Sequence, residues 1–272
     1  MTGSARGVLY PERLPTFHRL TPPAPAADLV RWFWVPEWDL PPGRTSRQDT
    51  IAYPASNLVV EPDLVGFAGP TTHRSHRDLT GRGWAVGALL RPAAVPALVD
   101  DPGSTRDRYL PLDLPDLHAT VCEAMRSASD SAVTRGNASD DGDVRRTRAV
   151  QCFADWLRAR VPSISAEALL ANTMTDLIDG DSTVLQLEDV AARLAVSPRT
   201  VQRLARRYVG LPPAAMIRRR RLQEAAERIR TEPGLDLAAI AADLGYADQA
   251  HLTNDFRAVL GHTPSRYRRE SS

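Results

Sequence analysis

The sequence contains no lysine, and its 272 residues include only two cysteines. Cys122 and Cys152 stand far apart, so neither a disulfide framework nor a cysteine-based zinc site is expected, and the chain suits a reducing cytoplasm. No apolar run approaches the ~20 residues that a membrane span requires, and no secretory signal pattern opens the chain. The expectation is a cytoplasmic protein with no membrane partner.

Residues that could carry catalysis or hold a metal ion are also scarce. His73 and His76 form a His-x-x-His pair, but a metal site would need a third ligand at a clear spacing. No Ser/His/Asp arrangement, phosphate-binding glycine loop or pair of carboxylates stands out. The chain is therefore expected not to be an enzyme, and to have no catalytic residue, no cofactor and no metal.

The net charge of +1 hides an uneven distribution. Residues 184–270 contain 15 arginines and 10 acidic residues, which leaves residues 1–183 with a net charge of −4. The planar arginine side chain can bind guanine or phosphate through two hydrogen bonds at once. A basic C-terminal segment of this kind is typical of a domain that contacts nucleic acid.

The first half of the chain has the pattern of β-structure. Residues 8–42 are rich in proline and aromatic residues, which disfavours long helices. Short apolar runs, separated by glycine and proline, follow at 58–60, 65–67 and 84–90. Such runs predict a small antiparallel barrel or sandwich, followed by one short helix near residues 94–99.

The middle of the chain predicts a loop and then helices. Residues 127–143 are mostly small or polar and predict a flexible loop. From Val144 onward apolar residues recur at helical spacing, at Val150, Phe153, Leu157 and Val161. This apolar face either packs inside the chain or forms a homodimer, and the sequence favours neither. A second helix is predicted over residues 166–178.

The last third of the chain repeats one pattern. The apolar positions are Leu187, Val190, Ala191 and Leu194 in the first copy, and Leu237, Ile240, Ala241 and Leu244 in the second. Each set is the buried face of a two-turn helix. A short turn and a second helix follow, and the second helix begins at Ser197-Pro198 or at Asp248. The copies end at Gly210 and Gly261, so the second contains one extra residue in its turn or second helix.

A helix, a short turn and a second helix form the arrangement that places the second helix in the DNA major groove. Arginine suits guanine, amides suit adenine, and methyl groups suit thymine. The predicted base-reading residues are Arg199, Gln202, Arg203, Gln249, Ala250, Thr253 and Asn254. The predicted phosphate contacts are Ser197, Thr200, Arg206, Arg218 and Arg220, the last two in a helix over about 214–230 that joins the copies.

The segment from about Leu185 to Arg269 resembles the DNA-binding domain of AraC/XylS-type transcriptional regulators. The likeness is carried by Leu187-x-x-x-Ala191-x-x-Leu194, by Ile240-Ala-x-x-Leu244-Gly-Tyr, and by Gly261-x-Thr-Pro264-x-x-Tyr267-Arg268. Pro212 and Asn254 depart from the usual Ser or Thr and the common Arg, so no target sequence is transferred. The resemblance implies a sequence-specific regulator with double-stranded DNA and RNA polymerase as partners.

The same resemblance implies an α+β protein whose N-terminal half is a small β-barrel or cupin-like sensing domain. Its aromatic-rich variant matches Trp32-Phe33-Trp34, Tyr53 to Asn57, Gly69-Pro70 and Gly83-Trp84. A small, partly apolar effector is expected among Trp34, Trp38, Phe67 and Trp84. The predicted division is 1–120 for this domain, 121–180 for the loop and linker helices, and 181–272 for the two helix-turn-helix units.

An enzyme of the DNA-repair type fused to a DNA-binding tail is the alternative. Such an enzyme needs a reactive cysteine in a Pro-Cys-His setting. Cys122 lies in Val-Cys-Glu and Cys152 in Gln-Cys-Phe, so neither cysteine provides that setting.

Overall fold

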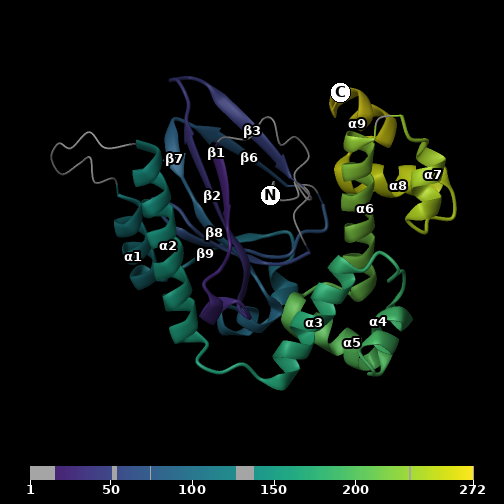
Figure 1. Ribbon diagram of the computed structural model, residues 1–272, viewed down its shortest axis with the longest axis horizontal. Coiled ribbons are helices and arrows are strands. Elements are labelled where there is room, and N and C mark those ends of the chain that lie inside the picture. The colour runs from purple at the N-terminus through teal and green to yellow at the C-terminus, as the bar shows by residue number, and fades with distance from the viewer. Residues whose placement is uncertain (1–15, 51–53, 74, 127–137, 233, 272) are drawn as a thin grey trace.

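The computed structural model describes residues 16–50, 54–73, 75–126, 138–232 and 234–271. Figure 1 shows a β-rich N-terminal part beside a helical C-terminal part. The strands are β1 (Thr16–Leu20), β2 (Val30–Asp39), β3 (Thr45–Thr50), β4 (Asn57–Val60), β5 (Val65–Ala68), β6 (Ser75–Thr80), β7 (Arg82–Trp84), β8 (Val86–Leu90) and β9 (Tyr109–Leu112). The predicted strand runs at 58–60, 65–67 and 84–90 are thereby confirmed. Tyr53 lies outside the described residues.

The strands form one large antiparallel sheet and a separate two-stranded ribbon. The large sheet has the order β1-β2-β8-β4-β5-β9, with β7 also paired to β2, and the ribbon consists of β3 and β6. The α+β class with a β-rich N-terminal part is confirmed. Within the described residues, the hydrogen bonds leave the large sheet open instead of closing it into a barrel.

One face of the large sheet is covered by helices α1 (Pro115–Met125) and α2 (Ala138–Arg160). Phe33 of β2 meets Phe153 of α2 edge to face, with ring centroids 5.5 Å apart. Val150, Phe153 and Leu157 are at most 3% exposed. The apolar face that could have formed a homodimer therefore packs inside the chain.

Helix α2 begins earlier than the sequence predicts. Residues 127–137 of the predicted loop lie outside the described residues, but residues 138–143 are the first turns of α2, so the loop prediction is wrong there. Arg145 and Arg146 bind the two carboxylate oxygens of Glu37 at 2.5 and 2.6 Å. Arg146 also binds Asp143 at 2.6 Å. These ion pairs fasten the polar start of the helix to β2, which the composition of the segment alone does not reveal.

The short helix predicted near residues 94–99 is the 3₁₀ helix η3 (Pro92–Ala97), which follows β8. The C-terminal helices are α3 (Ala166–Gly180), α4 (Leu187–Arg193), α5 (Pro198–Leu204), α6 (Pro213–Thr231), α7 (Leu237–Asp243), α8 (Gln249–Leu260) and α9 (Pro264–Ser271). A π-helical turn at Ala205–Val209 extends α5. None of the described helices is both long and apolar enough to cross a membrane.

Helix α6 joins the two helix-turn-helix units. The first unit comprises α4, α5 and the π-turn, and the second comprises α7 and α8. Figure 1 shows the first unit at the lower end of α6 and the second at its upper end. The 19 residues of α6 make it about 28 Å long.

In both units, one residue at the equivalent position of the turn has a left-handed backbone conformation. Gly245 has φ +73°, as its glycine predicts, while the equivalent Ala195 has φ +52°. The second helices end at Gly210 and Gly261, with φ +82° and +77°. Because Tyr246 corresponds to Val196 and the N-cap Asp248 to Ser197, the extra residue is Ala247 in the turn.

Buried apolar residues form two separate clusters. The first runs from Ala26 in the N-terminal part through α1, α2 and α3 and ends at Ile217 in α6. The second begins at Leu222 and contains the apolar residues of the second unit. The first unit therefore shares a core with the N-terminal part, while the second unit has its own. The three-part division at residues 120 and 180 stays a prediction.

We expect Ala195→Gly to stabilise the protein by about 1 kcal/mol, because a β-carbon is strained in the left-handed region. Gly245→Ala is the matched change, and it should destabilise by at least about 1 kcal/mol. Its β-carbon would also lie 2.9 Å from a methyl carbon of Leu185. Urea unfolding measures both effects, and a loss of stability in the Ala195→Gly protein would contradict the expected strain.

Candidate functional site

The outward face of α5 is polar because its apolar residues are used for packing. Val201 and Leu204 are fully buried. Ser197 caps the helix as predicted, since its Oγ accepts a hydrogen bond of 3.1 Å from the backbone N–H of Thr200. The predicted contacts Ser197, Arg199, Gln202, Arg203 and Arg206 are all exposed, and Thr200 is half-buried.

Helix α8 presents a second polar face in the second unit. The carboxylate of Asp248 caps the helix through the backbone N–H of His251, at 2.7 Å. Leu252 and Phe256 are buried. The remaining predicted base readers lie outward, because Gln249, Ala250 and Asn254 are exposed and Thr253 is half-buried.

The four consecutive arginines of α6 at 218–221 lie on different sides of the helix, and among them only Arg218 is exposed. Arg218 makes an ion pair of 2.7 Å with Asp255 of α8. Arg219 reaches the loop after β5. The guanidinium of Arg221 lies 3.8 Å above the ring of Tyr246, a cation–π contact that fastens the second unit to α6.

The structure corrects the phosphate contact predicted for Arg220. This side chain is 1% exposed. It donates to the carbonyl of Val184 at 2.7 Å and pairs with Glu224 at 3.3 Å. Arg220 therefore fixes α6 to the segment before α4 and does not face solvent.

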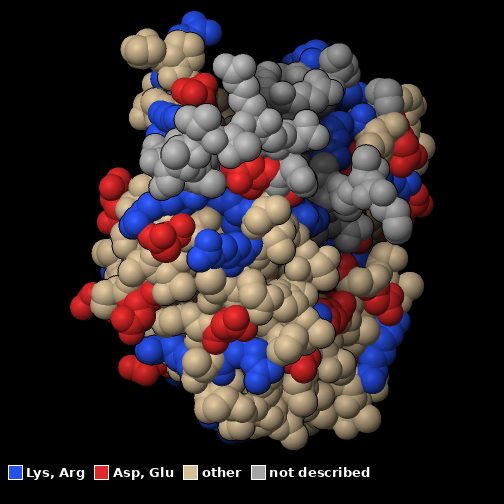
Figure 2. Space-filling view, turned by 60° about the vertical axis from the view of Figure 1, so that its left-hand side comes forward, with Lys and Arg blue, Asp and Glu red and all other residues tan. Residues whose placement is uncertain are grey.

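The face around α1 and α2 carries described side chains of both charges. Figure 2 brings forward the left-hand side of Figure 1, where α1 and α2 lie. Blue and red side chains are interspersed there among uncharged ones. A surface of mixed sign does not favour phosphate, so the helical faces of α5 and α8 are the better candidate for a DNA contact.

The four aromatic residues predicted to hold an effector do not come together. Side chains of directly paired residues lie on the same face of a sheet. The pairs Phe33–Ala88, Ala88–Leu58 and Leu58–Phe67 therefore place Phe67 on the helix-covered face with Phe33. Trp84 lies on that face too, because it pairs with Glu37 of β2. Trp34 and Trp38 alternate with these positions on β2 and point to the other face. Their rings lie over Gly87 and Gly83, where an added β-carbon would come within 2.1 and 2.4 Å.

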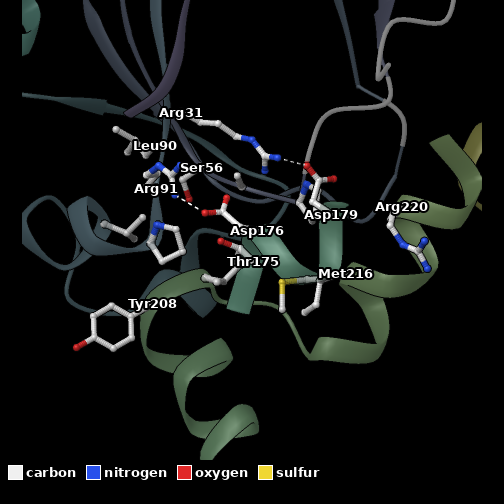
Figure 3. Close-up of a pocket in the computed structure, with 16 residues that line it drawn as sticks. Arg31, Ser56, Leu90, Arg91, Thr175, Asp176, Asp179, Tyr208, Met216 and Arg220 are labelled. Carbon is white, nitrogen blue, oxygen red and sulfur yellow. Dashed lines mark hydrogen bonds and ion pairs between the residues drawn. The ribbon is translucent and has the colours of Figure 1, made fainter. Parts of the chain in front are cut away.

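A pocket lies instead where the sheet, α3 and the first unit meet. Figure 3 shows Arg31, Ser56 and Arg91 from the N-terminal part on one side, and Tyr208 and Met216 from the C-terminal part on the other. Most of the exposed lining is apolar. The Ser56 side chain is 1% exposed, and its hydroxyl has no hydrogen-bond partner among the described residues.

Helix α3 forms one wall of this pocket and is bound tightly to the N-terminal part. Asp179 pairs with Arg31 at 2.5 Å, and Asp176 pairs with Arg91 at 2.6 Å. The buried amide of Asn172 accepts from the backbone N–H of Ala93 at 3.0 Å and donates to the carbonyl of Asp28 at 2.8 Å.

Sequence reasoning missed this pocket because its lining comes from segments far apart in the chain. One signal was present. Asn172, Asp176 and Asp179 recur at i, i+4 and i+7 in this helix, which places three polar groups on one face. Three polar side chains on one face of a predicted linker helix indicate that this face forms hydrogen bonds or ion pairs with another part of the chain.

Cys122 lies near a histidine, but the pair does not have the arrangement of an activated thiol. Its Sγ is 3.5 Å from Nε2 of His118. That nitrogen is also 3.0 Å from the carbonyl oxygens of Glu61 and Pro62, so it carries the proton that a catalytic base would have to lack. Burial raises the pKa of the Cys122 thiol, which lowers its reactivity.

Two family models match the chain. Residues 190–270 match a helix-turn-helix domain family. Residues 18–110 match a family described as a domain of unknown function (DUF6597). The first match covers both units, except for the first three residues of α4, with α6 between them. The second covers the strands of the N-terminal part except for the start of β1 and the end of β9.

Similar solved structures include the C-terminal domain of AraT, a response regulator from Geobacillus stearothermophilus. It is 28% identical and covers 39% of this chain and 88% of that one, with a TM-score of 0.35. ToxT from Vibrio cholerae O395 covers 88% of this chain and 98% of that one, at 10% identity and a TM-score of 0.43. Both TM-scores are low, so the family assignment rests on the sequence relatives.

The transcriptional activator AarP of Providencia stuartii is 37% identical over 92 residues, which are 34% of this chain and 67% of AarP. An AraC-like transcription regulator of Streptomyces lividans is 30% identical over 122 residues, 45% of this chain and 38% of the relative. VirS of Mycobacterium tuberculosis is 43% identical over 81 residues, 30% of this chain and 23% of VirS. The chain thus spans only part of the length of these relatives. It belongs to the AraC/XylS-type family of transcriptional regulators.

Proposed function

We propose that this chain regulates transcription by sequence-specific binding of double-stranded DNA through α5 and α8, under the control of a small-molecule effector. One observation carries the DNA-binding part of the proposal. Two copies of one unit turn the polar faces of their second helices outward at the two ends of α6. A spacing set by a helix of about 28 Å suits successive major grooves on one face of DNA, which lie about 34 Å apart.

The two units are expected to contribute unequally. The exposed face of α5 and of the π-helical turn that extends it carries Arg199, Arg203 and Arg206. Helix α8 offers Gln249, Thr253 and Asn254. Charged donors to phosphate and guanine contribute more to affinity than neutral amides and methyl groups. The first unit should therefore supply most of the affinity. RNA polymerase is proposed as a further partner.

We expect Gln202→Ala to relax base preference and to weaken binding to a site selected from random DNA by about 1–3 kcal/mol. Arg206→Ala is the control for a phosphate contact. It should weaken binding to all sequences alike and reduce the salt dependence of log affinity by about 1. Fluorescence anisotropy across a salt series distinguishes the two. Absence of any binding by the wild-type chain at low salt would refute DNA binding, since phosphate contacts strengthen as salt falls.

The effector is proposed to occupy the pocket between the sheet, α3 and the first unit. The apolar lining suits a small, mostly apolar molecule, and the buried hydroxyl of Ser56 offers one hydrogen bond to it. Because the lining comes from both parts of the chain, a ligand here would act on their packing directly.

Thr175→Tyr should fill this pocket, because Thr175 lines it. Thr173→Tyr places the same ring two residues earlier, at an exposed position that does not line the pocket. The probe is anilinonaphthalene sulfonate, an apolar dye with one anionic group. We expect Thr175→Tyr to weaken dye binding about tenfold and Thr173→Tyr to leave it unchanged. Equal dye affinity in both proteins would show that the dye binds elsewhere.

A further inference from the structure

We propose that the structure is a closed state in which the N-terminal part and α3 hold the first unit away from DNA through two contacts. In the first contact, Glu167 of α3 binds Arg203 and Arg207. In the second, Arg219 of α6 binds residues 71 and 73. This inference rests on the proposed DNA-binding function and concerns its regulation.

The first contact engages both oxygens of one carboxylate. Oε1 of Glu167 accepts from Arg203, and Oε2 accepts from Arg207 at 3.0 Å. The Glu167 side chain is 28% exposed, and the two arginines are 56% and 60% exposed. Glu167 lies in the first turn of α3, beside the capping residue Ser165, where the helix dipole also favours its negative charge.

This contact competes with DNA for the same guanidinium group. Arg203 is the central proposed base reader of α5, and the Glu167 carboxylate at its Nη1 competes with guanine for this side chain. The carboxylate at this position would also repel the phosphates that flank a major groove. Binding of DNA through Arg203 is therefore favoured once Glu167 has moved away.

The second contact fixes α6 to the sensing part. Nη2 of Arg219 donates to the carbonyl of Thr71 at 3.0 Å, to its hydroxyl at 2.8 Å and to the carbonyl of His73 at 2.8 Å. The two protons of Nη2 are thus shared among three acceptor oxygens. A further hydrogen bond, from Arg106 to the carbonyl of Gly210 at 2.9 Å, links the same part to the end of the first unit.

Of the three guanidinium nitrogens of Arg219, only Nη2 has hydrogen-bond partners among the described residues. The side chain is 4% exposed, and its Nε and Nη1 have no hydrogen-bond partner among the described residues. Burial lowers the pKa of Arg219 to about 10. The nearby Asp107 carboxylate offsets part of this effect, but no carboxylate bonds directly to Arg219 among the described residues, and such a buried cation raises the free energy of the state that contains it. Opening would return this cation to water or to phosphate, which lowers the free-energy cost of leaving the closed state.

Helix α3 connects the first contact to the proposed effector pocket. Its first turn carries Glu167, and its last turns carry Thr175, Asp176 and Asp179 in the pocket wall. A helix bonded at both ends moves as one body. An effector that displaces α3 at the pocket would therefore displace Glu167 from Arg203.

The test compares the full chain with three variants on a labelled duplex of mixed sequence that spans four helical turns, at about 50 mM salt. Glu167→Gln removes the charge that binds Arg203 and Arg207. Thr71→Val removes one acceptor of Arg219 and lies outside the proposed DNA surface. Glu188→Gln is the matched control, because it removes one exposed negative charge from the first unit. Circular dichroism confirms that each variant is folded.

We expect Glu167→Gln to bind the duplex about fivefold more tightly than wild type, and Thr71→Val about twofold. Glu188→Gln should change the affinity less than either. Failure of Glu167→Gln or Thr71→Val to exceed Glu188→Gln would overturn the closed-state proposal while leaving DNA binding intact. If no protein of the set binds the duplex, the DNA-binding function itself fails, which is a separate result.

Discussion

The attachment of α3 to the sheet is the constraint on which the rest of the arrangement depends. The buried amide of Asn172 donates to the carbonyl of Asp28 and accepts from the backbone N–H of Ala93. The ion pairs Asp179–Arg31 and Asp176–Arg91 strengthen the same attachment. Breaking one partner of such a buried bond leaves the other unsatisfied, which costs more than the bond contributes. The position of α3 is therefore well defined, and the first unit, the pocket and the Glu167 contact take their places from it.

The local features of the C-terminal part were predictable because they depend on neighbours in sequence. Ser197 before Pro198 marks a helix start, and Gly245 marks a left-handed turn, whatever the rest of the chain does. The left-handed Ala195 was not predictable, since alanine gives no sign of it. The same holds for Arg219 and Arg220. Their burial depends on the carbonyls of Thr71 and Val184, which lie 148 and 36 residues away.

In the N-terminal part, the positions of the strands were predictable from the sequence. The face of the sheet on which each side chain lies was not. Trp34 and Phe67 look alike in the sequence as apolar groups suited to a ligand. Their separation follows from strand register, because a shift of one residue moves a side chain to the opposite face. The polar start of α2 was also misread. Composition indicates a loop there, and only the ion pairs with Glu37 explain the helix.

The two separate cores give the two units different freedom to change during evolution. The second unit is packed on itself and on α6, so under the proposed function a substitution on α8 would alter the DNA sequence recognised without reaching the N-terminal core. The first unit shares its core with the sheet, and its reading face is also bound by Glu167. A substitution there changes recognition and control together. Divergence of target sites among close relatives should thus begin in the second unit, where Asn254 already departs from the residue common in the family.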